Sequence, residues 1–293
     1  PDEALPTIVA SYGRVARTDP DVFLGLDVPI SGIAGDQQAA LVGHAGFSAD
    51  SVKCTYGTGS FLLLHTGEKI IHSAYGLLTT VALAHPNQSE PDACERRDFA
   101  IEGSIFVTGA AVQWLRDGLG IIQDSSEVEE LARTVPDSGG VVFVPALTGL
   151  GAPDWDPHAR GLIIGISRGT TAAHLARATL EAIALEVRDV IDLMIQETGV
   201  ELPYLAIDGG ASLNDLLCQL QADITQLPIK RSEQVEITGL GAAFLAGLGT
   251  GFWKNTEEIS RLTRISREFL PEANREDLYL HWRAAVSRSL NWS

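Results

Sequence analysis

The sequence has few cysteines, no long apolar run and a shortage of basic residues, and each shortage argues against a class of protein. The cysteines Cys54, Cys94 and Cys218 are odd in number and lack CxxC spacing, which fits a reducing cytoplasm better than a disulfide framework. No segment approaches the roughly 20 uninterrupted apolar residues of a membrane span. Lysine and arginine number 21 against 38 aspartates and glutamates, a net charge of −17. We therefore expect neither nucleic acid nor an anionic membrane as a partner.

Two familiar site motifs are also missing. The seven histidines form no HxH or HExxH pattern, so we predict no zinc site and no protein-held metal. The Walker sequence GxxxxGK[ST] does not occur. Because an acidic chain offers no general attraction for a nucleotide, a phosphate site has to be built locally from backbone N–H groups and a bound cation.

The length of 293 residues and the hydrophobic fraction of 45% suffice for one large core or two modest ones. Residues 1–28 contain Pro6 and Pro20 and few periodic apolar positions, so we expect an irregular lead-in left from a preceding domain. The first residues lack both a signal-peptide pattern and an initiator Met, which predicts a chain cut from a longer protein. Residues 29–293 are expected to form the folded domain.

Apolar periodicity predicts strands that first cluster and then alternate with helices, which is typical of an α/β fold with a mixed sheet. The expected strands are 29–35, 51–56, 60–66, 76–84, 99–102, 141–144, 162–166, 204–207 and a short one from 229. The expected helices are 36–42, 108–119, 125–134, 171–198, 212–225, 238–251 and 276–290. The strands at 29–35, 141–144 and 162–166 are expected to be buried, and residues 86–97 to form an exposed loop. The small residues of 238–251 should let that helix pack closely on a sheet.

The first candidate site is Gly35-Asp36-Gln37-Gln38, where a carboxylate follows a strand at the start of a helix. Open α/β sheets place their ligands at such points. Asp36 could be a general base that takes a proton from a substrate hydroxyl. It could equally be an N-cap aspartate, and the residue alone favours the cap because caps are far commoner than catalytic acids.

Two glycine-rich turns are further candidates. In Tyr56-Gly57-Thr58-Gly59-Ser60 the backbone N–H groups could point at one anion, although a tight hairpin would also need glycines for positive φ. In Asp208–Asn214 the glycines permit close approach of a flat or anionic ligand after a strand. Ser212 or Asn214 could instead be ordinary caps, and the segment is not the dinucleotide fingerprint GxGxxG.

Taken together, the motifs resemble those of the FGGY carbohydrate kinases, in particular the glycerol kinase branch. Seven blocks in the family's order cover about residues 29–253, which is far more specific than any one block. The blocks are 31–41 (SGIAGDQQAAL), 55–61 (TYGTGSF), 76–80 (GLLTT), 102–115 (EGSIFVTGAAVQWL), 145–160 (PALTGLGAPDWDPHAR), 208–214 (DGGASLN) and 239–253. Residues 161–181 also resemble the second signature of the family.

The resemblance implies an actin-like ATPase fold with two ribonuclease H-like domains and a ligand cleft between them. The chain matches only the second, carboxy-terminal domain, with its mixed sheet flanked by helices. The first domain would supply most polyol contacts, a magnesium-associated carboxylate and part of the phosphate cradle. We therefore expect this chain to be inactive alone.

The resemblance also implies roles for individual residues. Asp36 corresponds to the catalytic base, which also binds substrate. Gln37 and Phe61 correspond to glycerol contacts, one polar and one packing on the carbon chain. The expected nucleotide contacts are Thr58 and Gly59 in the phosphate turn, Gly109 and Gln113, and Gly210, Ala211 and Asn214 in the adenosine site.

The implied activity is ATP-dependent phosphorylation of glycerol to sn-glycerol 3-phosphate in a cytoplasmic, homo-oligomeric full-length protein. ATP or ADP and Mg²⁺ would be the cofactors, with Mg²⁺ held mainly through the phosphates and the other domain. The GDQQ tetrad favours glycerol over sugars. The alternatives are a family kinase for another polyol or sugar and a nucleotide-binding module without catalysis. Residues 14–28 lack the glycine-rich basic loop through which some bacterial glycerol kinases bind a sugar bisphosphate, so control of that kind is not expected.

Overall fold

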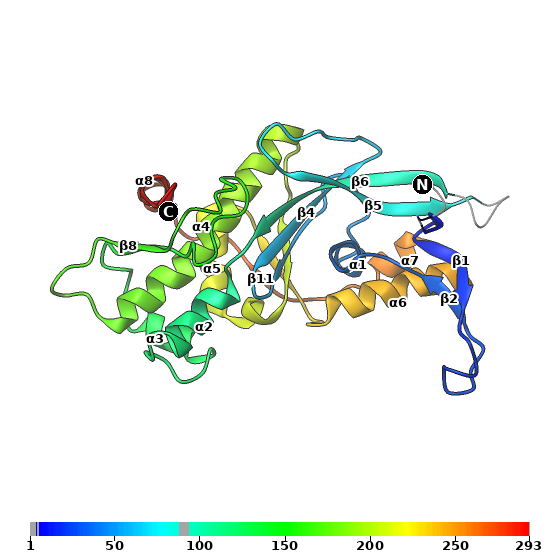
Figure 1. Ribbon diagram of the computed structural model, residues 1–293, viewed down its shortest axis with the longest axis horizontal. Coiled ribbons are helices and arrows are strands. Elements are labelled where there is room, and N and C mark those ends of the chain that lie inside the picture. Colours follow the sequence, from blue (N-terminus) through cyan, green and yellow to red (C-terminus); the bar gives the residue numbers. More distant parts are fainter. Residues whose placement is uncertain (1–3, 5, 88–93, 293) are drawn as a thin grey trace.

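The computed structural model describes residue 4 and residues 6–87 and 94–292, and its centre is a mixed sheet (Figure 1). Within these residues the sheet has seven strands in the order β11-β10-β9-β3-β4-β6-β5. Strands β3, β9 and β10 run parallel, and the other pairs are antiparallel. Their bounds are β3 Val52–Tyr56, β4 Ser60–Gly67, β5 Leu78–Pro86, β6 Cys94–Ile105, β9 Leu205–Asp208, β10 Ile229–Ser232 and β11 Ile265–Phe269. The predicted α/β class with a mixed sheet is confirmed.

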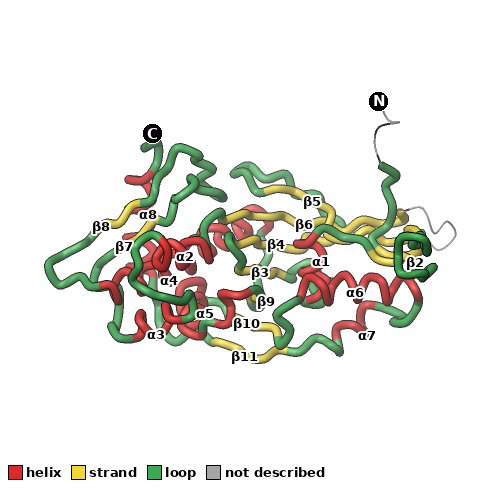
Figure 2. Tube along the Cα trace, turned by 60° about the horizontal axis from the view of Figure 1, so that its bottom comes forward, coloured by secondary structure: helices red, strands yellow, loops and turns green. Residues whose placement is uncertain are grey.

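Helices cover both faces of this sheet, as Figures 1 and 2 show. Leu62 and Leu64 of β4 belong to the large core with α4, whereas Leu63 between them contacts Leu41 of α1. All three leucines have no exposed surface, so β4 is buried on both sides. One face of the sheet carries α1 (Asp36–Gly43) and α6 (Ile237–Thr250), with α7 (Thr256–Ser260) beside them. The helices on the side of the other face are α4 (Ala172–Thr198), α5 (Asp215–Thr225), α2 (Gly109–Asp117), α3 (Glu127–Arg133) and α8 (Glu276–Ser289).

Two small hairpin sheets flank the main sheet and correct three predictions. Strand β1 (Tyr12–Arg17) pairs with β2 (Pro29–Gly32), so the prediction of an irregular 1–28 is wrong for this stretch. Its side chains are largely exposed, which leaves no apolar periodicity to detect. Strand β7 (Val142–Val144) pairs with β8 (Leu162–Ile164). Strands β2 and β8 were expected to be buried, but only Ser31 of β2 is buried, and the residues of β8 are half-buried or exposed. The origin of residues 1–28 in a preceding domain stays a prediction.

Polar segments account for most other differences. Residues 94–97, expected in an exposed loop, continue β6 and pair with β5, because backbone hydrogen bonds form whatever the polarity of exposed side chains. Residues 88–93 of that loop lie outside the described part of the chain. The helix expected at 212–225 is divided into a 3₁₀ turn, η2 (Gly210–Leu213), and α5, with Asn214 between them. Neither α7 nor β11 was predicted.

Helix α4 matches its prediction. It runs to Thr198 and ends at Gly199, whose φ of 68° is left-handed and whose N–H bonds the Ile195 carbonyl at 2.8 Å. The stripe of Leu180, Ala184, Val187, Ile191 and Met194 is buried throughout. The helix therefore forms the spine of the large core.

Helix α6 packs closely on a sheet, as expected: it lies against strands β1 and β2, and it also packs on helix α1. A Cβ atom at Gly241 would lie 1.7 Å from the Ala39 carbonyl oxygen and 2.9 Å from the Gly43 nitrogen. Only a glycine allows the two helix backbones to approach this closely. The close packing holds α1, and with it Asp36 at its first turn, against the domain.

Candidate functional site

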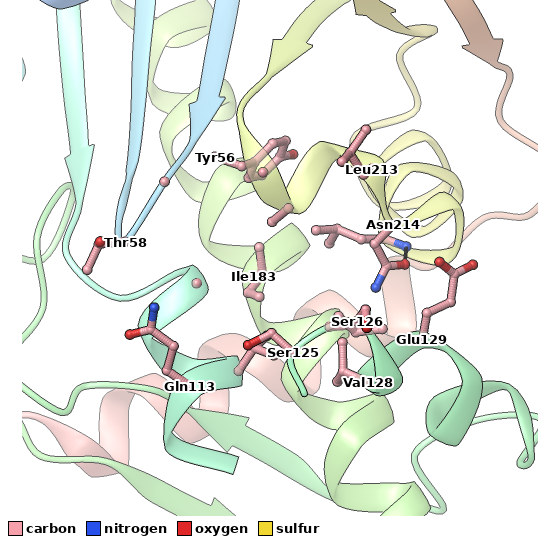
Figure 3. Close-up of a pocket in the computed structure, with 17 residues that line it drawn as sticks. Tyr56, Thr58, Gln113, Ser125, Ser126, Val128, Glu129, Ile183, Leu213 and Asn214 are labelled. Atoms are coloured by element: carbon pink, nitrogen blue, oxygen red, sulfur yellow. Dashed lines mark hydrogen bonds between the residues drawn. The ribbon is translucent and has the colours of Figure 1, made fainter. Parts of the chain in front are cut away.

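A cavity of about 450 Å³ opens where the parallel strands β3 and β9 end, at Tyr56 and Asp208 (Figure 3). This is the position at which α/β sheets bind ligands, and the volume suits a small molecule. Its walls come from the β3–β4 turn, α2, the start of α3, α4, and η2 with α5. The lining residues are Tyr56, Gly57, Thr58, Gly109, Val112, Gln113, Ser125, Ser126, Val128, Glu129, Leu180, Ile183, Gly210, Ala211, Leu213, Asn214 and Leu217.

The structure brings together six of the seven residues predicted to contact a nucleotide. Those that line the cavity are Thr58, Gly109, Gln113, Gly210, Ala211 and Asn214. The seventh, Gly59, belongs to the same turn as Thr58 but does not line the cavity. The residues come from three segments far apart in the sequence, and their meeting in one cavity is what a common ligand requires. Their binding roles stay predictions.

The predicted phosphate turn, Gly57–Gly59, is docked on the start of α2. The Thr58 carbonyl accepts hydrogen bonds from the N–H groups of Thr108 at 2.9 Å and Ala110 at 3.1 Å. The turn does join the antiparallel hairpin of β3 and β4, but neither Gly57 nor Gly59 has a positive φ, so positive φ is not the reason for these glycines. Space explains Gly59 instead, because a Cβ there would lie 2.2 Å from the Ile105 carbonyl oxygen. The turn is therefore held rigidly at the cavity mouth.

The predicted adenosine loop is fixed by capping bonds. Asn214 is the N-cap of α5, and its Oδ1 accepts from the Leu217 N–H at 2.9 Å. The Glu129 carboxylate accepts from the N–H groups of Asp215 and Leu216, each at 3.1 Å. The capping interpretation of Asn214 is thus correct, but it does not exclude binding: with Oδ1 engaged, the Nδ2 donor is the end that Asn214 can offer to a ligand.

Sequence reasoning missed the wall formed by Ser125, Ser126, Val128 and Glu129. These residues belong to a short polar segment with no motif, and no local signal places them beside α5. Ile183 was also missed as a lining residue, because a buried isoleucine on a long helix is indistinguishable from ordinary core. Figure 3 shows Ser126, Val128 and Glu129 beside Asn214.

The predicted substrate residues lie outside this cavity, on helix α1 and strand β4. Asp36 is the first residue of α1, it is exposed, and its Oδ1 accepts from the Gln37 N–H at 2.8 Å. The N-cap is Gly35, so the interpretation of Asp36 as an N-cap is wrong. Neither Asp36, Gln37 nor Phe61 lines the nucleotide-sized cavity.

A buried lysine that sequence reasoning missed connects two of these residues. Lys53 of β3 donates from Nζ to the Gln37 side-chain oxygen Oε1 and, at 3.1 Å, to the Phe61 carbonyl oxygen. Burial lowers the pKa of Lys53 to about 8, against the opposing effect of nearby carboxylates. Burial also raises the pKa of the neighbouring Glu102. The surroundings of the predicted substrate residues therefore combine a buried cation with acidic groups.

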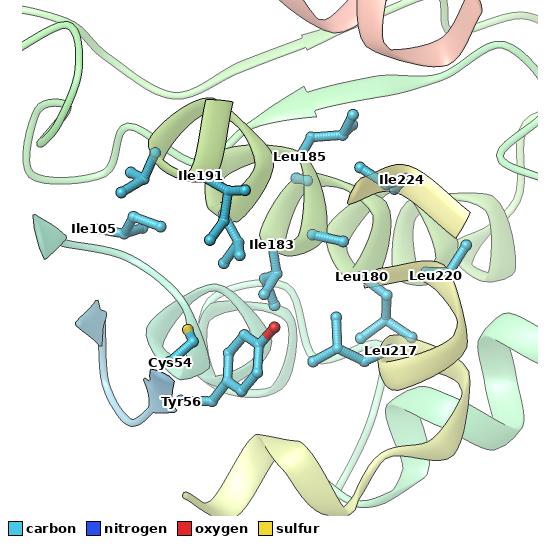
Figure 4. Close-up of a cluster of buried hydrophobic side chains, with 14 of the residues drawn as sticks. Cys54, Tyr56, Ile105, Leu180, Ile183, Leu185, Ile191, Leu217, Leu220 and Ile224 are labelled. Atoms are coloured by element: carbon cyan, nitrogen blue, oxygen red, sulfur yellow. The ribbon is translucent and has the colours of Figure 1, made fainter. Parts of the chain in front are cut away.

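A buried polar link joins the cavity walls. The Tyr56 hydroxyl donates to Gln221 Oε1 at 2.7 Å, and Gln221 Nε2 donates to the Ala184 carbonyl at 3.1 Å. The Tyr56 ring lies by Ile183 and Leu217 in the core (Figure 4). Burial raises the pKa of Tyr56 well above its usual value, so the hydroxyl stays a donor. The end of β3, helix α4 and helix α5 are thus fastened to one another.

Two further features concern residue 4 and residues 6–87 and 94–292, the described part of the chain. In that part of the chain, no group of three or more His, Cys, Asp or Glu side chains is arranged to hold a metal ion. None of its helices is both long and apolar enough to cross a bilayer.

Comparisons with known proteins agree with the fold. Residues 52–250 match the family model "FGGY family of carbohydrate kinases, C-terminal domain". Over its whole length the chain is 52% identical to glycerol kinase 2 of Thermotoga maritima and 50% identical to glycerol kinase of Oleidesulfovibrio alaskensis. It spans 58% of the length of each of these relatives.

Solved structures give the same picture. The crystal structure of Plasmodium falciparum glycerol kinase with ADP superposes with a TM-score of 0.89 at 36% identity, over 99% of this chain and 57% of that one. A xylulose kinase from Rhodospirillum rubrum has the same fold, with a TM-score of 0.80 at 22% identity, over 98% of this chain and 58% of that one. The predicted ribonuclease H-like, actin-like ATPase class is confirmed.

Proposed function

From the premise that this chain belongs to the FGGY family of carbohydrate kinases, we propose that it is the nucleotide-binding half of a glycerol kinase. The observation that carries the proposal is the convergence of six predicted nucleotide contacts on one cavity. The similarity to glycerol kinases along the whole chain supports glycerol as the acceptor. Because the chain spans 58% of those relatives, the activity is proposed for the full-length protein, with this chain inactive alone.

The proposed reaction is in-line transfer of the γ-phosphoryl group of ATP to a terminal hydroxyl of glycerol. The glycerol oxygen forms a bond to phosphorus as the bond to the ADP oxygen breaks, and the hydroxyl proton passes to Asp36. The products are sn-glycerol 3-phosphate and ADP. Such a transfer depends on positioning and charge neutralisation more than on covalent help. Thr58 and Gly59 would hold the transferring phosphate, and the loop from Gly210 would hold the adenosine.

The residues present fit a nucleotide better than they fit a metal ion. A Cβ atom at Gly210 meets nothing within 4 Å, so the cavity wall is open there, and Asn214 offers a side-chain donor. Within the described residues no three-ligand group could hold Mg²⁺. We propose that Mg²⁺ is held mainly through the phosphates and by residues outside this chain. The cytoplasmic location and the homo-oligomer also stay predictions.

A substrate comparison tests the proposed function. We expect the full-length protein to phosphorylate glycerol with a kcat/KM at least about tenfold above that for erythritol or xylulose, because a site built for one polyol leaves polar groups unpaired with another. A coupled assay of ADP release measures this. A preference for xylulose or erythritol would support the alternative of a kinase for another substrate. ADP binding without turnover of any acceptor would leave a nucleotide-binding module.

Filling the cavity should weaken nucleotide binding. In Gly210→Val the added side chain enters open space, so we expect a normal melting temperature and a Kd for ADP raised at least about tenfold, or 1.4 kcal/mol. Isothermal calorimetry measures the affinity. Gly169→Val is the control, because a Cβ at Gly169 meets only Ser167 Oγ at 3.8 Å and this glycine does not line the cavity. Equal ADP affinity in both variants would contradict the assignment of this cavity.

A further inference from the structure

Strand β3 carries a lysine, Lys53, at a buried position where an apolar residue would be expected. Lys53 is in the centre of the sheet and has no exposed surface. Its strand neighbours Cys54 and Val52 point into the large core, and Lys53 points to the opposite face, toward α1. A buried ammonium group is costly and persists only when its hydrogen bonds are satisfied. The hydrogen-bond partners of Lys53 therefore indicate what this buried lysine does.

The ammonium group of Lys53 has three N–H donors, and three acceptors on other residues lie within hydrogen-bond distance of it. They are Gln37 Oε1, Thr55 Oγ1 at 3.0 Å and the Phe61 carbonyl at 3.1 Å. All three acceptors are neutral. Thr55 lies directly opposite Phe61 in the β3–β4 pair, so Lys53 bridges this pair to the first turn of α1. Two of the partners, Gln37 and Phe61, are the proposed glycerol contacts.

This arrangement determines which way the Gln37 amide faces. An ammonium group cannot accept a hydrogen bond, so only the carbonyl end of an amide can face it. Gln37 Oε1 is therefore directed to Lys53, and Nε2 is the end left for a ligand. The Gln37 backbone is held as well, because its N–H donates to Asp36 Oδ1 at 2.8 Å. Lys53 thus acts on a side chain next to the proposed base.

We infer that Lys53 is a positioning residue of the polyol subsite: it holds the Gln37 amide so that Nε2 donates to a hydroxyl oxygen of the substrate. The inference rests on the proposed glycerol kinase function. It assigns the subsite a donor beside the Asp36 acceptor. A polyol hydroxyl, which both accepts and donates, matches this pair. A substrate with a hydrogen in place of that hydroxyl would leave the Gln37 donor unpaired, which lowers affinity.

The charge environment makes this contact dependent on pH. Burial lowers the pKa of Lys53 to about 8, while Asp208 of β9, Cys54 of its own strand, Glu102 of β6 and Asp36 of α1 act to raise it. His44, at the end of α1, lies 3.6 Å from Asp208. Above pH 8 the neutral amine has only two N–H donors for three acceptors. The KM for glycerol should therefore rise as the pH passes 8.

The experiment is steady-state kinetics of the full-length protein with glycerol and ATP. In Lys53→Met we expect the KM for glycerol to rise at least about tenfold, with a smaller change in kcat, because an orienting hydrogen bond to a binding group is lost. The Kd for ADP should stay within about twofold, and the alkaline rise in KM should disappear. The control is Lys69→Met, which removes an exposed ammonium group and should leave all of these values unchanged.

A second variant tests the Gln37 donor directly. Gln37→Glu keeps an acceptor for Lys53 but removes the Nε2 donor, so the fold should persist while the KM for glycerol rises at least about tenfold. A KM within about twofold of wild type in either folded variant would overturn the inference. If Lys53→Met does not fold, Gln37→Glu and the wild-type pH profile decide the question. Wild-type protein without activity on glycerol would overturn the proposed function instead, which keeps the two failures apart.

Discussion

Replacing Asp36 with asparagine in the full-length protein is expected to lower kcat for glycerol phosphorylation by about 10³-fold, since general-base catalysis contributes about 10²–10⁴-fold. The asparagine cannot take the proton of the attacking hydroxyl. Its side-chain oxygen can still accept from the Gln37 N–H, as Asp36 Oδ1 does at 2.8 Å, so the start of α1 should be preserved. Because Asp36 does not line the nucleotide cavity, the Kd for ADP should not change. Rapid-quench and steady-state assays, with calorimetry for ADP, measure these quantities.

The control for Asp36→Asn has to remove a carboxylate from another helix start. Glu257 is exposed in the first turn of α7, so Glu257→Gln changes the charge and the helix-dipole interaction in a similar way. We expect this control to keep wild-type kcat. Near-normal turnover of Asp36→Asn would eliminate Asp36 as the base. Equal losses in both variants would attribute the effect to helix charge.

Gly241→Ala is expected to lower the free energy of unfolding by about 3 kcal/mol, the upper end of the usual cost of overpacking. Two effects compete here. Alanine is the better helix former by about 1 kcal/mol, which would stabilise α6. However, the new Cβ would lie 1.7 Å from the Ala39 carbonyl oxygen, and both contact partners are helix backbones that cannot turn aside. The steric clash should outweigh the gain in helix propensity and force α6 away from α1. Urea denaturation followed by circular dichroism measures the change.

The same helix provides the control. Gly239 is exposed, and a Cβ there meets nothing within 4 Å, so Gly239→Ala isolates the helix propensity. We expect this variant to be more stable than wild type by about 0.5–1 kcal/mol. Opposite signs for two glycine-to-alanine changes separated by one residue would show that α1 and α6 meet backbone to backbone. Stabilisation by Gly241→Ala would refute this packing.

Turn chemistry explains why six residues that line the cavity, the candidate nucleotide site, could be named from the sequence. The segments around Thr58 and Gly210 each follow a strand, and strands β3 and β9 are parallel neighbours whose ends meet. A glycine-rich turn at such an end is a local pattern, so the ordered motifs located it. The wall of the cavity that contains Glu129 could not be predicted in this way. Glu129 reaches α5 through hydrogen bonds that span 86 and 87 residues of sequence, and nothing near it records that contact.

The polarity of a residue does not reveal its burial or its strand pairing, and two segments illustrate this. Lys53 reads locally as a charged residue in a strand, which suggests an exposed face, yet it is fully buried because acceptors from α1, β3 and β4 converge on it. Cys94–Arg97 look like a loop but are fixed by pairing with β5. In each case, residues on another helix or strand determine the burial or the pairing. Periodicity within one segment cannot reveal it.

The link from Tyr56 through Gln221 to Ala184 bears on how binding energy is used. It ties the phosphate turn at the end of β3 to the two helices beside the adenosine loop. A ligand that enters this cavity therefore meets walls whose spacing is already set, and little conformational entropy is lost in ordering them. This is preorganisation: free energy not consumed in shaping the pocket remains available for other steps. In the full-length kinase that we propose, that remainder would be available to bring the two halves together over the substrates.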